Sequence, residues 1–313
     1  MFQRILIPLD GSPRAELILS RVDHLWRGES SELVLVHSVS DYGLLNGRYN
    51  TAPSLEHRRD EAESYLRGVA RRYTDVGARV HTRVLEGSPA GAILDAARRE
   101  EATMIAMTTH GRTGILRWLM GGVADQVLRA TDVPVLLLRA VHPMDPPPPE
   151  SEPPRATPFR RILIATDGSA TSMAVVDPVM QVAAQFDSEI IALHVWDSYV
   201  LDGSPLLGME AGMMPPPEAP LASEDEATAR VARQLAASGL KVTRVTRYGE
   251  PASEILDHSF EHHVDLIALA THDRWELSRW MTGSVAERVL RSAGVPLLVV
   301  RAEEKPALVS RGL

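Results

Sequence analysis

Two aspartates, Asp10 and Asp167, each end an apolar run and are followed by Gly-Ser. A carboxylate at the end of a strand can contact a ligand there, or it can accept hydrogen bonds from the backbone amides of a turn. The residues alone leave both roles open. The sequence RILIPLDGS at 4–12 returns as RILIATDGS at 161–169, which indicates a duplicated domain rather than a short repeat.

Two pairs of histidines also recur between the copies. His37 matches His194, and His110 matches His272. An imidazole at a strand end can act as a proton acceptor or can pack as a hydrogen-bonded group. No serine or cysteine nucleophile is matched to either pair. We therefore expect these histidines to have structural or ligand-contact roles rather than catalytic ones.

A third pair, His258 and His262, has the i, i+4 spacing that can place two zinc ligands on one helix face. His263 lies beside them, but the aligned places in the first copy hold Ala96 and Glu100, and no third ligand is evident. The sequence therefore favours a solvated helix face, and we predict no metal site.

The elements that must position these residues are apolar runs that alternate with helical patterns. The runs lack polar alternation, as expected of strands buried on both faces. Alternation with short connections predicts an α/β fold, a doubly wound parallel sheet in each copy. The expected strands are Arg4–Leu9, Leu33–Val39, Arg79–Leu85, Thr103–Thr108 and Val135–Arg139, then Arg161–Thr166, Glu189–Trp196, Lys241–Tyr248, Asp265–Ala270 and Leu297–Arg301.

A proline-rich segment separates the copies. Residues 140–159 contain eight prolines, a composition that favours extended chain over a packed core. The predicted organisation is domain 1 over 1–141, a linker over 142–157, domain 2 over 158–302 and a C-terminal tail over 303–313.

Two longer connections follow the second strand of each copy, at 40–54 and 197–222. Ligands bind at the carboxyl ends of strands in open α/β sheets, so these segments serve either as lids over a pocket or as surface loops.

Composition excludes several classes of protein. The 33 lysine and arginine residues stand against 41 aspartate and glutamate, a formal charge of −8, which argues against nucleic-acid binding. The absence of cysteine excludes disulfides and thiolate zinc sites. The first residues show no signal-peptide pattern, and no apolar run reaches the roughly 18–20 residues of a membrane span. We expect a cytoplasmic protein without membrane contact.

Several motifs together resemble the universal stress protein (UspA-like) superfamily, as a tandem two-domain member. They are I-L-I-x-x-D-G-S, the histidine of the second strand, T-H-G-R-T-G, G-x-V-A-x-x-V-L-R and V-P-x-L-x-x-R. The resemblance covers nearly all of both copies and implies two five-stranded parallel sheets of order 3-2-1-4-5 with helices on both faces. Many members of that family bind ATP, whereas others act through dimerisation or partner contacts.

The family's nucleotide signature is G-x2-G-x9-G-[S/T]. In the first copy its register falls on Thr108, Gly111, Gly121 and Gly122, so two positions match. Glycines let the backbone approach a phosphate, and amides at a helix N-terminus meet its charge. The resemblance therefore implies a site for ATP, with or without Mg²⁺, in domain 1, where Arg112 would help to hold the phosphates.

The second copy departs further from the signature. The closing Gly283 and Ser284 are intact, but Ala270 and Asp273 replace the first two glycines. A carboxylate about 4 Å from a phosphate would repel it by about 1–4 kcal/mol. These changes weigh against a tight triphosphate site in domain 2.

The nucleoside end of the site is also implied by the resemblance. In ATP-binding relatives the aspartate that matches Asp10 and Asp167 contacts the nucleoside, and the residue after the second-strand histidine lines the adenine pocket. The latter positions are Ser38 and Val195.

The apolar runs VPVLLLRA and VPLLVVRA are edge strands in the implied order, and exposed apolar edges need cover. We expect the copies to cover each other as an intramolecular pseudo-dimer, with a homodimer of whole chains as a further possibility.

Two functions remain open from the sequence. One is a nucleotide-responsive stress factor that binds an adenine nucleotide mainly in domain 1 and hydrolyses it slowly at most, so that it is not an enzyme. The alternative is a scaffold or adaptor in which both sites have decayed. A hydrolase or transferase is disfavoured because there is no Walker-type lysine or metal-binding carboxylate cluster.

Overall fold

The computed structural model describes residues 2–26, 31–40, 54–110, 122–140, 159–197, 225–271 and 285–302. The predicted linker, the predicted tail and nearly all of the two long connections lie outside these residues.

Each copy contributes five strands. In domain 1 they are β1 (Arg4–Pro8), β2 (Glu32–Val39), β3 (Arg79–Glu86), β4 (Met104–His110) and β5 (Val135–Ala140). In domain 2 they are β6 (Arg161–Ala165), β7 (Glu189–Asp197), β8 (Lys241–Gly249), β9 (Leu266–Thr271) and β10 (Leu297–Arg301). All ten expected strands are confirmed, with ends that shift by one or two residues.

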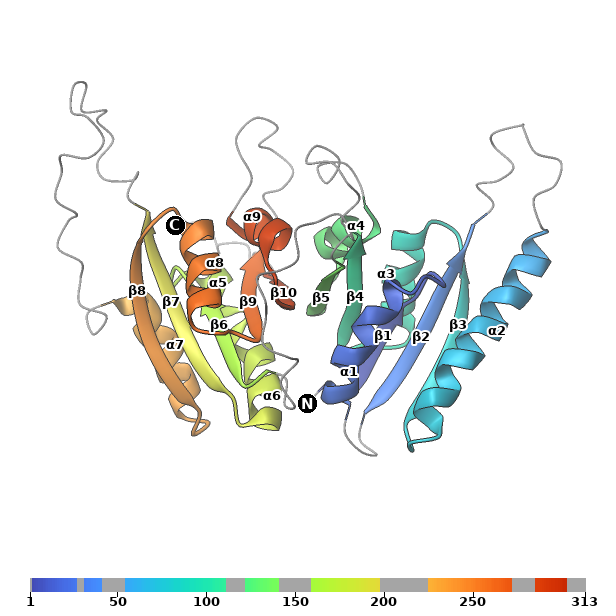
Figure 1. The fold of residues 1–313 in the computed structure, drawn as a ribbon, viewed down its shortest axis with the longest axis horizontal. Coiled ribbons are helices and arrows are strands. Elements are labelled where there is room, and N and C mark those ends of the chain that lie inside the picture. Colours follow the sequence, from blue (N-terminus) through green and yellow to red (C-terminus); the bar gives the residue numbers. More distant parts are fainter. Residues whose placement is uncertain are drawn as a thin grey trace, which may run out of the picture.

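The strands form a single ten-stranded sheet of order β3-β2-β1-β4-β5-β10-β9-β6-β7-β8. Pairing is parallel within each copy, and both halves have the order 3-2-1-4-5, as predicted. The halves lie side by side with β5 and β10 at the centre, and helices cover both faces (Figure 1).

The helices of domain 1 are the short 3₁₀ helix η1 (Ala15–Ile18), α1 (Leu19–Leu25), α2 (Leu55–Thr74), α3 (Pro89–Arg99) and α4 (Val123–Ala130). Those of domain 2 are α5 (Ala170–Met173), α6 (Val176–Phe186), α7 (Glu226–Ala236), α8 (Pro251–Glu261) and α9 (Val285–Ser292). None of the described helices combines the length and the apolar character needed to cross a membrane.

The strands are apolar on both faces because each face carries its own core. Ile5 and Ile7 of β1 join one core with η1, α1 and α2, whereas Leu6 between them joins the other core with α3 and α4. Domain 2 repeats this division with α6 and α7 on the first face and α8 and α9 on the second. Both cores run through the two halves without interruption, so the domains share their hydrophobic interior.

Antiparallel pairing of β5 with β10 joins the halves. Leu136 lies opposite Leu298, and both side chains are almost completely buried. Across the same junction the Nε2 of Gln185 donates to the carbonyl of Leu25 at 2.9 Å. The expected mutual cover of the two edge strands within one chain is therefore present, and no apolar edge is left open at the centre.

Shortening Leu136 to alanine should destabilise the chain by about 2–5 kcal/mol, because a buried side chain at the junction leaves a cavity. Urea unfolding followed by circular dichroism measures this change. Val76→Ala is the matched control, since Val76 is 66% exposed and should shift the free energy of unfolding by no more than about 0.5 kcal/mol. Equal effects of the two substitutions would contradict a junction packed as described.

Candidate functional site

The Asp10 turn lies at the carboxyl end of β1. The amide of Ser12 donates to Oδ1 of Asp10 at 2.9 Å, and Gly11 has a φ of +82°, a left-handed conformation that suits glycine. The Oγ of Ser12 then accepts from the amide of Ala15 at 3.1 Å, which helps to start η1. Asp10 therefore stabilises the turn by accepting this hydrogen bond. Its side chain is also exposed at the carboxyl edge of the sheet, where ligands bind in α/β folds of this kind.

Domain 2 repeats the same turn. The amide of Ser169 donates to Oδ1 of Asp167 at 2.9 Å, and Gly168 has a φ of +75°. Burial raises the pKa of Asp167, but the hydroxyls of Ser169 and Ser172 and the turn amide stabilise the carboxylate and bring its pKa below the usual value. The turn thus holds its aspartate ionised in this copy.

What surrounds the two turns differs between the copies. A Cβ placed on Gly168 would lie 2.9 Å from Cα of Ala227, in the first turn of α7, whereas a Cβ on Gly11 would meet only Cε1 of His37, at 3.9 Å. Arg230 of α7 also donates to the carbonyl of Gly168 at 2.6 Å. The start of α7 therefore covers the turn of domain 2, and among the described residues nothing covers that of domain 1 so closely.

Helix length explains this difference. Helix α7 has 11 residues and α2 has 20, and four residues separate each helix from the next strand. The shorter helix begins level with the strand ends, so its N-terminus rests on the Gly168 turn. The longer helix instead passes this level with Tyr65 facing His37, at 6.0 Å between ring centroids in an edge-on arrangement.

The two recurrent histidines of the second strands have different partners. The Nδ1 of His194 lies 2.9 Å from Oδ2 of Asp225, a buried residue whose Oδ1 caps α7 through the amide of Ala227. The hydroxyl of Thr246 donates to the same Oδ2 at 3.0 Å. These hydrogen bonds hold the N-terminus of α7 against β7 and β8. They also give the imidazole of His194 a partner within the protein.

His37, in contrast, has a buried Nδ1 without a hydrogen-bond partner in the described part of the chain. Burial lowers the pKa of His37, although the carboxylate of Asp10 acts in the opposite direction. The imidazole is therefore neutral at pH 7 and lies near the Asp10 turn with one ring nitrogen unused. His110 ends β4 and His272 lies outside the described residues, so the other pair gives no comparison.

The remaining predicted residues are only partly brought together. Thr108 is buried and its hydroxyl donates to the carbonyl of Ala15 at 3.4 Å, so it ties β4 to η1. The hydroxyl of Ser38 donates to the carbonyl of Gly87 at 3.2 Å. Val195 packs on the α8 and α9 face of domain 2.

Gly122 precedes α4 as its N-cap with no side-chain cap, and a Cβ there would meet open space. Within the described part of the chain, no side chain therefore caps the first turn of α4. The predicted Gly111, Arg112, Gly121, Gly283 and Ser284 lie outside the described residues.

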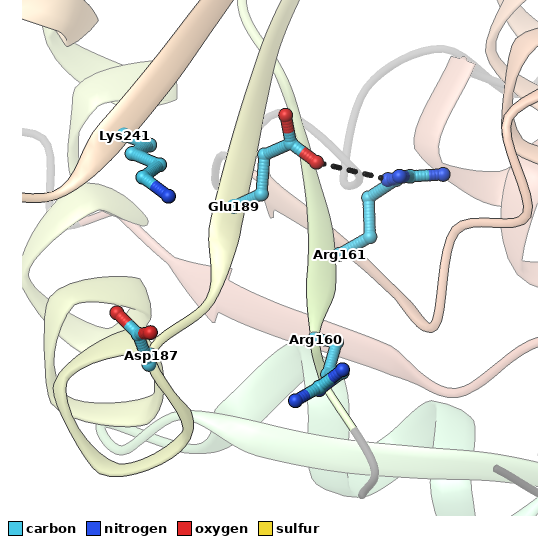
Figure 2. Close-up of a pocket in the computed structure, with 5 residues that line it drawn as sticks. All are labelled: Arg160, Arg161, Asp187, Glu189 and Lys241. Atoms are coloured by element: carbon cyan, nitrogen blue, oxygen red, sulfur yellow. Dashed lines mark hydrogen bonds and ion pairs between the residues drawn. The ribbon is translucent and has the colours of Figure 1, made fainter.

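The described surface includes a hollow in domain 2 and another beside η1 and α2 of domain 1. One, of about 350 Å³, lies at the amino ends of β6, β7 and β8 between Arg160, Arg161, Asp187, Glu189 and Lys241 (Figure 2). Arg161 there pairs with Glu189 at 3.3 Å. The other, of about 610 Å³, is a groove between η1 and α2 lined by Glu16, Tyr65, Gly68 and Arg72 among others. Side chains of both charges line the hollow in domain 2, and the groove beside α2 is open to solvent. Neither is therefore a better candidate for a ligand site than the strand ends.

One prediction about the histidines is wrong. His258 is 3% exposed rather than solvated, because it lies on the face of α8 that packs against the sheet. His262, at the end of the helix, and His263 are exposed.

Two residues of the structure were not anticipated. The structure shows Asp225 as the partner of His194 and the N-cap of α7. Its N-cap role could have been predicted, because an aspartate ahead of a helical run is a typical N-cap signal. Glu261 joins the His258 pair at i+3, a spacing that could have been read from the sequence.

Comparison with known proteins agrees with this geometry. A profile of the universal stress protein family matches residues 1–139 and 158–301. Universal stress protein MJ0531 of Methanocaldococcus jannaschii is 34% identical over 149 residues, 47% of this chain and 85% of its own length. YxiE of Bacillus subtilis is 30% identical over 147 residues, 46% of this chain and 99% of its own. The crystal structure of a universal stress protein from Archaeoglobus fulgidus has a TM-score of 0.69 at 19% identity, over 96% of this chain and 97% of that one, which supports the fold.

The contact of α7 with the Gly168 turn can be tested by placing alanine at each of the two matching glycines. Gly11→Ala should cost about 1–2 kcal/mol for the left-handed backbone. Gly168→Ala should cost about 1–3 kcal/mol more, because its methyl group meets Ala227. Thermal or urea unfolding of both variants gives the difference, and equal costs would show that α7 does not press on the turn.

Proposed function

The chain belongs to the universal stress protein family, and we propose from that premise that it binds an adenine nucleotide, ATP as its magnesium complex, in domain 1. The observation that carries the proposal is the difference between the two turns. Among the described residues, a Cβ on Gly11 would meet only His37, at 3.9 Å, whereas the start of α7 covers the Asp167 turn.

The phosphate end of the nucleotide would lie at α4. No described side chain caps this helix after Gly122, and a phosphate would find both hydrogen-bond donors and a favourable dipole at its N-terminus. Gly111, Gly121 and Arg112 belong to the same proposed site from their place in the sequence.

The nucleoside end would lie at the Asp10 turn. Asp10 is exposed at the end of β1, and β2 brings Ser38 to the same edge of the sheet. The neutral imidazole of His37 lies behind the turn with an unused Nδ1, a polar atom that a ligand or a water could bond. A ribose carries two hydroxyls that suit a carboxylate acceptor.

In domain 2 the matching residues Asp167, Val195, Gly283 and Ser284 form the weaker candidate. Arg230 and Ala227 already contact the Gly168 turn, and Asp225 already bonds His194. A nucleotide would have to displace the N-terminus of α7. Domain 2 therefore serves to complete the sheet and hold domain 1.

We propose binding rather than turnover as the function, in the cytoplasm, with any hydrolysis slow. A scaffold that acts through partner contacts or a homodimer is the second candidate. It is favoured by one observation, that Thr108 stands where the signature has glycine and is already bonded to Ala15.

Isothermal titration with Mg-ATP tests the proposal on the whole chain. Asp10→Ala should weaken binding by about 10- to 100-fold, since a hydrogen bond to a charged group contributes about 1.5–3 kcal/mol. Asp167→Ala is the matched control, because it removes the same turn carboxylate from the covered copy and should leave the affinity unchanged.

Three outcomes would contradict this assignment. They are no heat at millimolar nucleotide, equal loss of affinity in the two variants, and loss in the Asp167 variant alone. The first would favour the scaffold.

A further inference from the structure

A second cluster of possible ligands lies at the C-terminal end of α8, away from the strand ends. His258, Glu261 and His262 each bring one nitrogen or oxygen atom to a common point, where these atoms lie within 4.8 Å of one another. The spacing of i, i+3 and i+4 places them on one side of the helix. The first copy has Ala96 in place of His258, so this cluster is particular to domain 2.

The cluster already holds a positive group. The Nη2 of Arg247, on β8, lies 3.1 Å from Nδ1 of His258 and 2.7 Å from Oε2 of Glu261. A guanidinium can only donate hydrogen bonds, so Nδ1 of His258 must present its lone pair to it. The proton then lies on Nε2, which is buried and has no partner among the described residues.

This arrangement aims a lone pair, a carboxylate and a second imidazole at one cation. Only 3% of His258 is exposed, and the centroid of its ring lies 4.0 Å from that of His262. The C-terminal end of a helix also carries partial negative charge, which favours a cation. Two independent features, the buried imidazole and the arginine held between two of the ligands, therefore point to the same position.

We propose that His258, Glu261 and His262 bind a divalent transition-metal ion of the zinc class, and that Arg247 leaves the cluster when the metal enters. Two nitrogens and one carboxylate oxygen match zinc better than magnesium or calcium, which prefer oxygen ligands. The Arg247 side chain is partly exposed, so it can move into solvent.

Only small movements are needed. Zinc with ligand bonds of about 2.0–2.2 Å in a tetrahedron requires ligand atoms roughly 3.4 Å apart. Glu261 and His262 are both exposed at the helix end, so their side chains can rotate toward the buried His258. Three protein ligands leave the fourth position for water, an arrangement seen in zinc sites that are open to solvent.

The test uses the full chain, stripped of metal with a chelator and without nucleotide. Titration with ZnCl₂ by calorimetry, with Co²⁺ absorption as a second readout of coordination, should give one ion per chain. Glu261→Gln and His262→Ala should each weaken binding at least tenfold. Both residues are exposed, so far-UV circular dichroism should show unchanged folding.

Arg247→Gln gives the sharper outcome. Since it removes a competing positive charge, it should tighten zinc binding severalfold, which a surface histidine that binds zinc by chance would not do. His57→Ala is the control, because His57 is an exposed histidine paired with Glu61 at i, i+4 on α2 and should have no effect.

The proposal is overturned by the absence of saturable binding, by wild-type affinity in the Glu261 and His262 variants, or by weaker binding in Arg247→Gln. None of these outcomes bears on Mg-ATP binding in domain 1, which is measured separately.

Discussion

The pairing of β5 with β10 is the interaction on which the whole arrangement depends. Each copy alone would end in an apolar edge strand, which natural sheets have to cover. Antiparallel hydrogen bonds and the buried Leu136–Leu298 contact cover both edges at once, and they turn two five-stranded halves into one sheet. The continuous cores on both faces follow from that junction, so neither domain has to be complete by itself (Figure 1).

A shared scaffold leaves the two copies free to diverge at the strand ends. In domain 2 the shorter helix α7 brings Asp225 to His194 and Ala227 to Gly168, and these contacts stabilise the turn by covering it. In domain 1 the longer helix α2 brings Tyr65 toward His37, and among the described residues only His37 approaches the Cβ position of Gly11. This difference is the reason for proposing the nucleotide site in domain 1, whereas the proposed metal site lies on α8 of domain 2.

The fold could be predicted from the sequence because its determinants are local. Unbroken apolar runs, the helical spacing of Ala62, Leu66, Val69 and Tyr73, and the repeated Asp-Gly-Ser turn each specify an element by periodicity or turn chemistry. The environment of the site could not be predicted in this way. Burial of His258 and the Asp225–His194 contact depend on how a helix is placed over the sheet, and the two residues of that contact are 31 positions apart in the chain. The difference in length between α2 and α7, and its effect on Gly168, are evident only in the structure.

The number of nucleotides that one chain holds tests this division of roles most directly. Native mass spectrometry of the intact protein with increasing Mg-ATP counts them without assuming which site is filled. We expect the population to stop at one nucleotide per chain, because the start of α7 covers the Gly168 turn of domain 2. Two nucleotides bound with comparable affinity would show that the covered turn is an open site after all, and would contradict a single site in domain 1.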